Sequence, residues 1–263
     1  MPDTTPIHPA DGSRTRACRS CRDDEPLGFD FTMAYQPILD LRTERPWAYE
    51  ALVRGPSGES AATVLGQVND DNRYRFDQAC RVKAIELACG LGLPSQGNTR
   101  LSINFLPNAV YQPAACIQAT LKAADRFGLD PTRLMFEVTE GEEISDASHL
   151  VNIFTEYRKR GFTTAIDDFG AGYSGLNLLA RFQPHVIKLD MELTRTIDQD
   201  RVRQAIVEGI LLVAGKLDIQ IVAEGIETDA ECATLRDLGV HLMQGYLFAR
   251  PVVGALALAS ATT

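Results

Sequence analysis

The sequence lacks a long hydrophobic run and an excess of positive charge. The longest apolar stretch, AIVEGILLVAG (205–215), is interrupted by Glu208 and is shorter than the about 18 residues that a membrane span needs. We therefore expect a buried helix there, no secretory signal peptide and no membrane insertion. The net charge of −9 excludes a general binder of nucleic acids or anionic membranes, which needs a basic surface. A small phosphate ligand stays open, because its pocket can be locally positive or can hold a metal.

Clustered cysteines and histidines are also lacking. The six cysteines are scattered, and most fall in helical patterns, so we expect reduced thiols in a cytoplasmic protein. Cys18 and Cys21 form a lone CxxC without the second ligand pair of a zinc site, which leaves a metal or redox role as the lesser alternative. The histidines are not spaced as metal ligands, and we expect His185 and His241 to be packing or surface residues.

Composition divides the chain into one domain and two tails. Residues 1–28 are polar and show no periodicity, which predicts a flexible N-terminal tail. Residues 29–254 are expected to form a single domain, and residues 255–263, rich in small side chains, a C-terminal tail. The hydrophobic fraction of 45% and the charged fraction of 23% are ordinary for a globular protein.

Within the domain, short β-rich runs alternate with helical patterns. The runs are 31–41, 47–54, 101–106, 134–140, 163–169, 186–190, 219–226 and 242–249. The clearest helical patterns are 75–92, 148–161 and 228–239, the last opening with a capping box of Thr228 and Glu231. This alternation predicts an α/β fold, a modified (β/α)8 TIM-like barrel. Only RTERP separates the first two runs, too few residues for a parallel crossover, so we expect an antiparallel strand near the start and place Glu50 and Arg54 on it.

Polar side chains lie near the ends of most predicted strands. They are Asn104, Glu137, Glu140, Asp167, Asp168, Lys188, Asp190, Glu224 and Gln244. Catalytic groups of such barrels converge at the C-terminal ends of the strands. One buried acid could be a structural accident, but so many at one depth are hard to explain as solvated strand ends. Oxygen ligands without a Cys/His cluster favour Mg²⁺ or Mn²⁺ over zinc. The adjacent Asp167 and Asp168 suit two cations about 3.5–4 Å apart, the usual arrangement for hydrolysing a phosphodiester.

Eight motifs together resemble the EAL domain, a family of cyclic di-GMP phosphodiesterases. They are YQPI (35–38), YEALVR (49–54), LSINF (101–105), FEVTE (136–140), DDFGAGYSGL (167–176), IKLD (187–190), AEGIET (223–228) and QGYLFARP (244–251). The family takes its name from the tripeptide present here as Glu50-Ala51-Leu52. The resemblance covers about residues 31–252, and the motifs stand in the family order.

The resemblance implies hydrolysis of cyclic di-GMP to linear pGpG by a water that two cations, Mg²⁺ or Mn²⁺, activate. The implied metal ligands are Glu50, Asn104, Glu137 and Asp167 for one cation, and Asp167 and Asp168, with Glu224 nearby, for the other. Lys188 is expected to orient the water and Glu224 to accept its proton, and Glu50 counts as catalytic through its metal. The implied substrate contacts are Gln36, Leu52, Val53, Arg54, Asp190 and Gln244.

The glycine-rich segment after the aspartates resembles the family's loop that couples metal binding to a dimer interface. The residues involved are Glu140 as the loop anchor, Phe169, Gly170, Gly172 and Ser174, and they imply a homodimer. Glu140 could instead be an ordinary acid at a helix N-terminus. Residues 55–76 depart from the family pattern, which bears on the ligand rim and the partner surface. No cyclase or sensor pattern is found, and we expect a stand-alone module.

Two other functions stay open at this point. The first is a catalytically silent receptor that binds cyclic di-GMP and acts through protein partners. Receptors of this kind usually lack a metal ligand or the loop, and both are present here. The second is a barrel enzyme that acts on another phosphodiester. For single residues a structural role also stays open: Asp190 could only brace Lys188, and Gln244 could only cap its strand.

Overall fold

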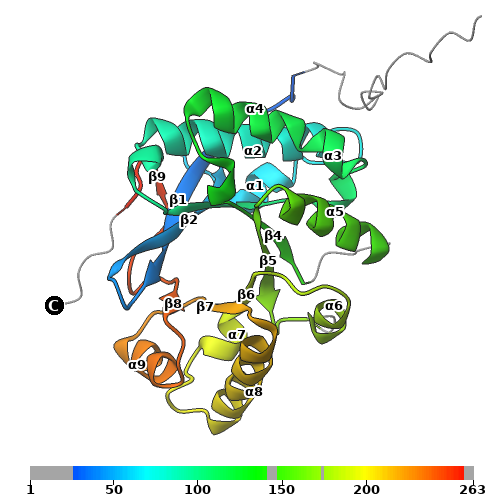
Figure 1. Ribbon diagram of the computed structural model, residues 1–263. Helices are drawn as coiled ribbons and strands as arrows, with labels where there is room; N and C mark the ends of the chain where they lie inside the picture. The colour runs from blue at the N-terminus through cyan, green and yellow to red at the C-terminus, as the bar shows by residue number, and fades with distance from the viewer. Residues whose placement is uncertain (1–25, 141–146, 173–174, 258–263) are drawn as a thin grey trace, which may run out of the picture.

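The computed structural model describes residues 26–140, 147–172 and 175–257. The predicted tail with Cys18 and Cys21, the loop residue Ser174 and the last six residues therefore lie outside the described part. The described strands form one sheet that closes on itself, with helices around it (Figure 1). The strands are β1 (Thr32–Asp40), β2 (Arg45–Arg54), β3 (Arg100–Asn104), β4 (Leu134–Thr139), β5 (Thr163–Phe169), β6 (Val186–Leu189), β7 (Gln220–Ala223), β8 (Leu242–Met243) and β9 (Val252–Val253).

The barrel closes through its first strand, β1. This strand pairs antiparallel with both β2 and β8, whereas β2 to β8 follow one another in parallel. The modified (β/α)8 barrel is thus confirmed, but the strand that runs against the others is β1. Glu50 and Arg54 lie on β2, which is antiparallel to β1 but parallel to β3. The expectation that they lie on the strand that runs against the rest of the barrel is therefore wrong. The unpredicted β9 pairs with β1 at Ala34 and Tyr35.

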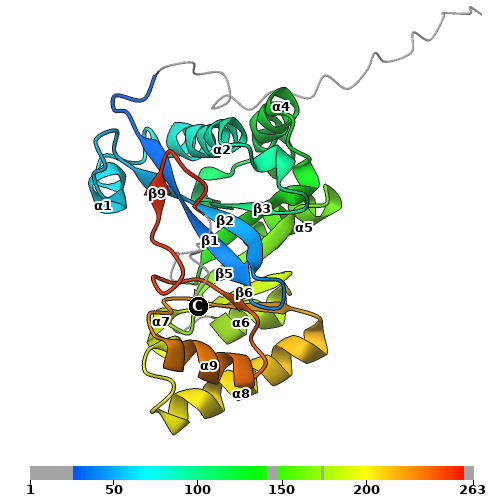
Figure 2. The ribbon, with the colours of Figure 1, turned by 90° about the vertical axis from the view of Figure 1, so that its left-hand side faces the viewer.

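The helices surround the barrel. They are α1 (Ala61–Leu65), α2 (Arg73–Gly90), α3 (Pro113–Cys116), α4 (Gln118–Phe127), α5 (Ala147–Lys159), α6 (Gly175–Arg181), α7 (Met191–Thr194), α8 (Arg201–Leu217) and α9 (Asp229–Asp237), with 3₁₀ turns at Leu93–Ser95, Pro107–Ala109 and Pro131–Arg133. Figure 2 shows α2 and α4 on one side of the barrel and α8 and α9 on the opposite side. The three predicted helical patterns correspond to α2, α5 and α9, and the capping box of Thr228 and Glu231 is present.

A buried apolar layer fills one end of the barrel and fixes the height of the polar layer above it. The layer consists of Ile38, Ala48, Met135, Ala165, Val186, Val222 and Leu242. Because side chains alternate along a strand, the residue two positions further on faces the interior again. Those positions hold Glu50, Glu137, Asp167, Lys188, Glu224 and Gln244, and Gln36 on the antiparallel β1. The barrel interior therefore changes from apolar to polar between two successive layers of side chains.

The helix α8 corrects one expectation from the sequence. Of its residues, Val207 and Ala214 are buried, whereas Leu212 is 64% exposed and Ile206 is 45% exposed. The prediction that this helix is buried is thus wrong. Apolar side chains lie on both faces of α8, but only one face packs on the barrel. In the described part of the chain, no helix is both long and apolar enough to cross a membrane.

Candidate active site

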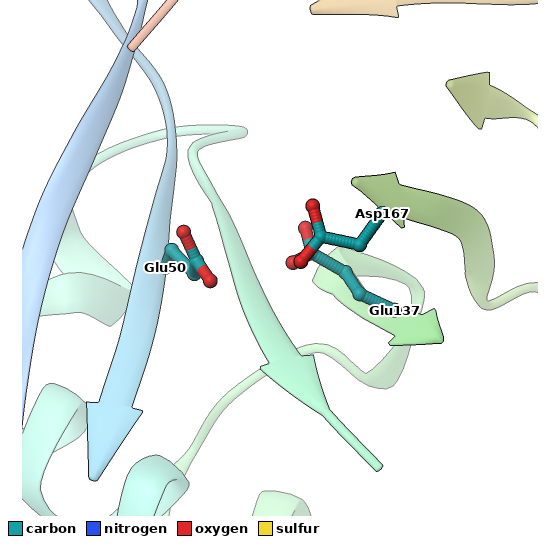
Figure 3. Close-up of side chains that lie close together, drawn as sticks. All are labelled: Glu50, Glu137 and Asp167. Carbon is teal, nitrogen blue, oxygen red and sulfur yellow. The ribbon is translucent and has the colours of Figure 1, made fainter. Parts of the chain in front are cut away.

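Three buried carboxylates from three strands of the sheet meet inside the barrel. Glu50 on β2, Glu137 on β4 and Asp167 on β5 point toward one another (Figure 3). Each offers an oxygen within 4.8 Å of the others, and at most 7% of each residue is exposed. Like charges that are so close and so deeply buried repel one another, so a positive partner must stabilise them.

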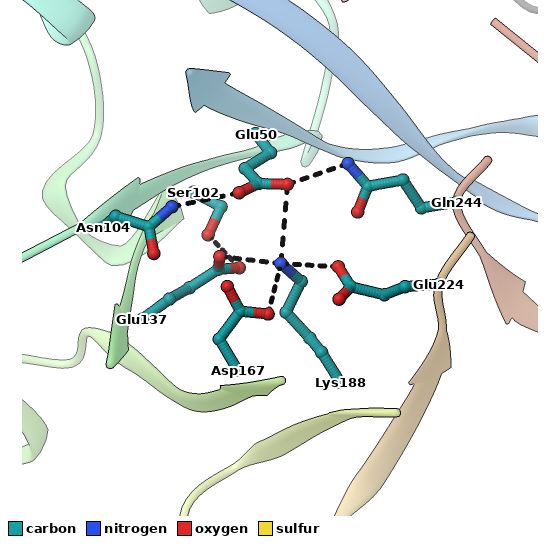
Figure 4. Close-up of polar contacts among 8 residues, drawn as sticks. All are labelled: Glu50, Ser102, Asn104, Glu137, Asp167, Lys188, Glu224 and Gln244. Carbon is teal, nitrogen blue, oxygen red and sulfur yellow. Dashed lines mark hydrogen bonds and ion pairs between the residues drawn. The ribbon is translucent and has the colours of Figure 1, made fainter. Parts of the chain in front are cut away.

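The positive partner within the chain is Lys188 on β6, which is fully buried at the centre of the cluster (Figure 4). Its Nζ lies 2.9 Å from Oε2 of Glu137 and 2.9 Å from Oδ1 of Asp167. It also lies 2.7 Å from Oε1 of Glu224 and 3.4 Å from Oε2 of Glu50. One ammonium group thus faces four carboxyl groups, and the site keeps an excess of acidic groups.

The pKa values reflect this crowding. Burial, with the charges of Glu50 and Asp167, raises the pKa of Glu137 to about 8 against the opposing effect of Lys188. Burial also raises the pKa of Glu224 well above its usual value, and the charge of Asp167 adds to the effect. Burial alone would lower the pKa of Lys188, but the surrounding carboxylates hold it well above its usual value. The cluster is therefore short of positive charge in the absence of a cation.

Amide and hydroxyl groups hold the carboxylates in place. Asn104 Nδ2 donates to Oε1 of Glu50 at 3.0 Å, and Gln244 Nε2 donates to Oε2 of Glu50 at 2.8 Å. Ser102 donates its hydroxyl hydrogen to Oε1 of Glu137. Ser102 was not predicted as a site residue, although it lies two positions before Asn104 on the inward face of β3. This alternation is the signal that could have identified it.

Asp168 forms a second acidic group with its neighbours. Asp167, Asp168 and Glu224 each offer an oxygen within 4.8 Å of the others. Asp168 has a φ of 53°, a left-handed conformation that is uncommon outside glycine but open to aspartate. Burial and the nearby charges of Asp167 and Asp190 raise the pKa of Asp168 to about 6. The two acidic groups share Asp167, which is the arrangement expected for a carboxylate between two cations.

The donor set fits hard divalent cations. The grouped ligands are carboxylates, with the amide of Asn104 beside them, and such oxygen donors suit Mg²⁺ and Mn²⁺. Within the described part of the chain, the buried Oε1 of Gln244 has no hydrogen-bond partner. An unused acceptor beside crowded carboxylates is what a cation or its water would satisfy. The residues present therefore fit a divalent metal site.

A cavity of about 610 Å³ opens over the cluster. Of the predicted substrate contacts, it is lined by Gln36, Leu52, Val53, Asp190 and Gln244. Arg54 is not among the described residues of the lining, and its Nη1 donates to the carbonyl oxygen of Val53 at 2.7 Å. Asp190 accepts from Glu192 N and caps α7, and Gln36 Nε2 donates to Ala249 O.

The lining also contains residues that the sequence analysis did not single out. They include Asp77 on α2, Arg195 after α7, Glu227 after β7 and Tyr246 after β8. Helix and loop positions have no strand periodicity that would mark them as inward-facing, so the sequence pattern gave no signal. On the departing segment 55–76, Ala61 and Leu65 line the cavity, in agreement with the expected effect on the ligand rim.

The loop after β5 is tied to the end of β4. Glu140 accepts from Gly170 N at 2.7 Å and from Gly175 N at 2.6 Å, and it lies 4% exposed. Gly170 has a φ of 100°, and a Cβ there would lie 2.4 Å from Leu193, so only glycine fits. A Cβ at Gly172 would lie 3.3 Å from Oε1 of Glu140. Glu140 therefore makes the contacts expected of a loop anchor, and Phe169 is buried at the end of β5.

The chain matches a known domain family and several solved structures. The EAL domain profile matches residues 25–251. A standalone versatile EAL protein from Vibrio cholerae O395, solved in its c-di-GMP-bound form, is 53% identical with a TM-score of 0.86, over 90% of this chain and 98% of that chain. Klebsiella pneumoniae BlrP1, solved as a calcium/cy-diGMP complex, is 37% identical with a TM-score of 0.81, over 89% of this chain and 59% of that chain.

Two curated relatives come from Escherichia coli K12. The blue light- and temperature-regulated antirepressor BluF is 33% identical over 92% of this chain and 58% of its own length. The probable cyclic di-GMP phosphodiesterase PdeD is 37% identical over 85% of this chain and 42% of its own length. The chain thus spans about half the length of these relatives. With the domain profile matched over most of its residues and with an acidic cluster at the expected strand ends, the chain belongs to the EAL domain family.

Proposed function

We propose that the protein hydrolyses cyclic di-GMP to linear pGpG with the help of two divalent cations, Mg²⁺ or Mn²⁺. The observation that carries the proposal is the ring of four carboxyl groups around Lys188 at the base of a 610 Å³ cavity. Such a cavity has the size of sites that enclose small organic ligands. The relatives support the ligand, because BlrP1 was solved with cyclic di-GMP and calcium or manganese.

The metal ligands follow from the two acidic groups. Glu50, Asn104, Glu137 and Asp167 would hold one cation, and Asp167 and Asp168 the other, with Glu224 beside them. Cations bound there supply Lewis acidity: they lower the pKa of a water and stabilise negative charge on the phosphate. Ser102 and Gln244 keep the Glu137 and Glu50 carboxylates oriented through hydrogen bonds.

Lys188 and Glu224 take the remaining roles in the reaction. The Nζ of Lys188 is buried and charged, so it would orient the attacking water and stabilise the charge that develops on the phosphate oxygens. Glu224, whose carboxylate faces the cavity, would accept the proton of that water. The water oxygen would form a new bond to phosphorus while the P–O3′ bond breaks, the 3′ oxygen would take a proton from solvent, and the product would be linear pGpG. Gln36, Leu52, Val53, Asp190 and Gln244, which line the cavity, would contact the substrate, and Arg54 would do so after its guanidinium turns away from Val53 O.

The test is hydrolysis by the purified chain. We expect pGpG from cyclic di-GMP with Mg²⁺ or Mn²⁺, resolved by chromatography, and no product with EDTA. Glu50→Ala should abolish turnover with an unchanged circular dichroism spectrum, whereas Glu86→Ala on the exposed side of α2 should turn over normally. Binding without hydrolysis by the wild type would instead support a receptor. Equal activity in EDTA would exclude the metal mechanism.

We also propose a homodimer formed by α6 and α8, which lie before and after β6 and α7 in the chain. Apolar side chains stay exposed on both: Leu176 is 68% exposed, Val202 is 69% exposed and Leu212 is 64% exposed. A second copy of the chain would cover this face, and α6 begins where Glu140 holds Gly175. The described cysteines, Cys80, Cys89, Cys116 and Cys232, are not joined by disulfides, as expected of the cytoplasmic location that we propose.

A further inference from the structure

An arginine–glutamate pair lies in the wall of the cavity and is not part of the acidic cluster. Arg195 Nη1 lies 2.6 Å from Oε2 of Glu227, and Arg195 Nη2 lies 3.0 Å from Oε1 of the same carboxylate. Both residues line the cavity, and both side chains stay partly exposed, 31% and 42%. The pair is therefore flat and bidentate, and it is accessible to a molecule that fills the cavity.

Two chain segments are tied together to hold this pair. Glu231, 2% exposed, accepts from Thr196 N with Oε1 and from Glu227 N and Thr228 N with Oε2. A few residues earlier, Thr194 Oγ1 donates to Glu224 O at 2.5 Å. These bonds fix the backbone on both sides of the pair, so the side chains of Arg195 and Glu227 project from positions that cannot shift independently.

The backbone next to Arg195 is strained. Thr196 has a φ of 54°, and a β-branched residue rarely adopts this left-handed conformation. Arg203 Nη1 supports it by donating to Thr196 Oγ1 and to Arg195 O. A strained residue of this kind destabilises the fold by more than a partly exposed ion pair stabilises it. The stability of the fold therefore does not explain the arrangement, and strained backbone of this kind is concentrated at ligand sites.

We propose that Arg195 reads a guanine base of the dinucleotide, with Glu227 holding its guanidinium in the plane of the base edge. This inference rests on cyclic di-GMP as the proposed substrate. Guanine presents two adjacent acceptors, N7 and O6, to which arginine donates two hydrogen bonds, whereas adenine presents a donor next to N7. Glu227 uses one N–H on each terminal nitrogen, and no other acceptor among the described residues takes the remaining N–H groups of Arg195, so they can make this contact. Arg195 is thus a specificity-determining residue.

The test compares substrates with and without a base. For Arg195→Gln we expect the KM for cyclic di-GMP to rise about tenfold or more, since a bidentate base contact accounts for such a factor. The kcat/KM for bis(p-nitrophenyl) phosphate, which has no base, should stay unchanged, and the preference for cyclic di-GMP over cyclic di-AMP should fall. The matched control is Arg42→Gln, which removes a similar pair with Asp40 at the opposite end of the barrel. It should change none of these values.

The outcomes separate this inference from the proposed function. If the wild type hydrolyses cyclic di-GMP and Arg195→Gln does so with the same KM and base preference, the role of Arg195 is overturned alone. An equal loss on both phosphodiesters overturns it as well, since a base contact cannot affect a substrate without a base. A wild type that neither binds nor hydrolyses cyclic di-GMP overturns the proposed function and this inference together.

Discussion

Single residues divide into those that the strand pattern identifies and those that it does not. Glu50, Glu137 and Asp167 were found because a charged residue near the end of a β-rich run is unusual, and the structure brings them together. Ser102 was not found, because a serine within a strand is chemically ordinary. Its importance comes from its partner, the buried carboxylate of Glu137, which lies 35 residues away in the sequence. The alternation along β3 could have marked Ser102 as inward-facing, but its contact with Glu137 cannot be read from the local pattern.

The hydroxyl of Ser102 should determine how well Glu137 binds a metal. Ser102→Ala leaves Oε1 of Glu137 without its buried donor, so the carboxylate can turn away from the metal position. We expect the Mn²⁺ concentration for half-maximal activity to rise about 10- to 100-fold, as for other residues that orient metal ligands. Metal titration of the hydrolysis rate measures the effect. Ser95→Ala, at an exposed position outside the barrel, is the control. An unchanged metal requirement would show that Ser102 does not orient the ligand.

At the scale of elements, the strands were easier to predict than the surroundings of the helices. All eight predicted strands exist, because β-rich runs between helical patterns are a local signal. The short β9 was missed, since two residues show no periodicity and its pairing with β1 is a tertiary contact. The exposure of α8 was missed for a related reason. An apolar helix pattern does not say whether the barrel or another surface covers each face.

The connection between β5 and α6 gives a prediction at this scale. Glu140 accepts hydrogen bonds from Gly170 N and Gly175 N, at the two ends of the connection. In Glu140→Ala both amides lose their acceptor, at about 1–3 kcal/mol for each one left unpaired. We expect faster amide hydrogen exchange in the peptide that spans β5 and α6, and lower hydrolysis. Glu86→Ala, on the exposed face of α2, should change neither. Unchanged exchange in Glu140→Ala would show that the carboxylate does not anchor the connection.

For the whole molecule, the closed barrel explains both the site and the exposed face. Closure through the antiparallel β1 leaves the C-terminal ends of β2 to β8 at one mouth, and the metal ligands, Lys188 and the cavity wall gather there. The polar residues at this mouth could be predicted from the sequence, because a polar residue recurs near the C-terminal end of most predicted strands. The outer surface has no such repeat, so the assembly of the protein can be argued only from exposed side chains such as Leu212.

The exposed apolar face of α8 should control the oligomeric state. Leu212→Glu places a charge at the centre of the proposed interface, where burial without a partner is costly. We expect a dimer for the wild type and a monomer for the variant by light scattering, with the melting temperature of each protomer nearly unchanged because Leu212 is 64% exposed on its own chain. Val253→Glu, an equally drastic change at a 47% exposed position on β9, should remain dimeric. A monomeric wild type would refute the interface. A monomeric variant that loses activity, while Val253→Glu keeps it, would link the dimer to the connection between β5 and α6.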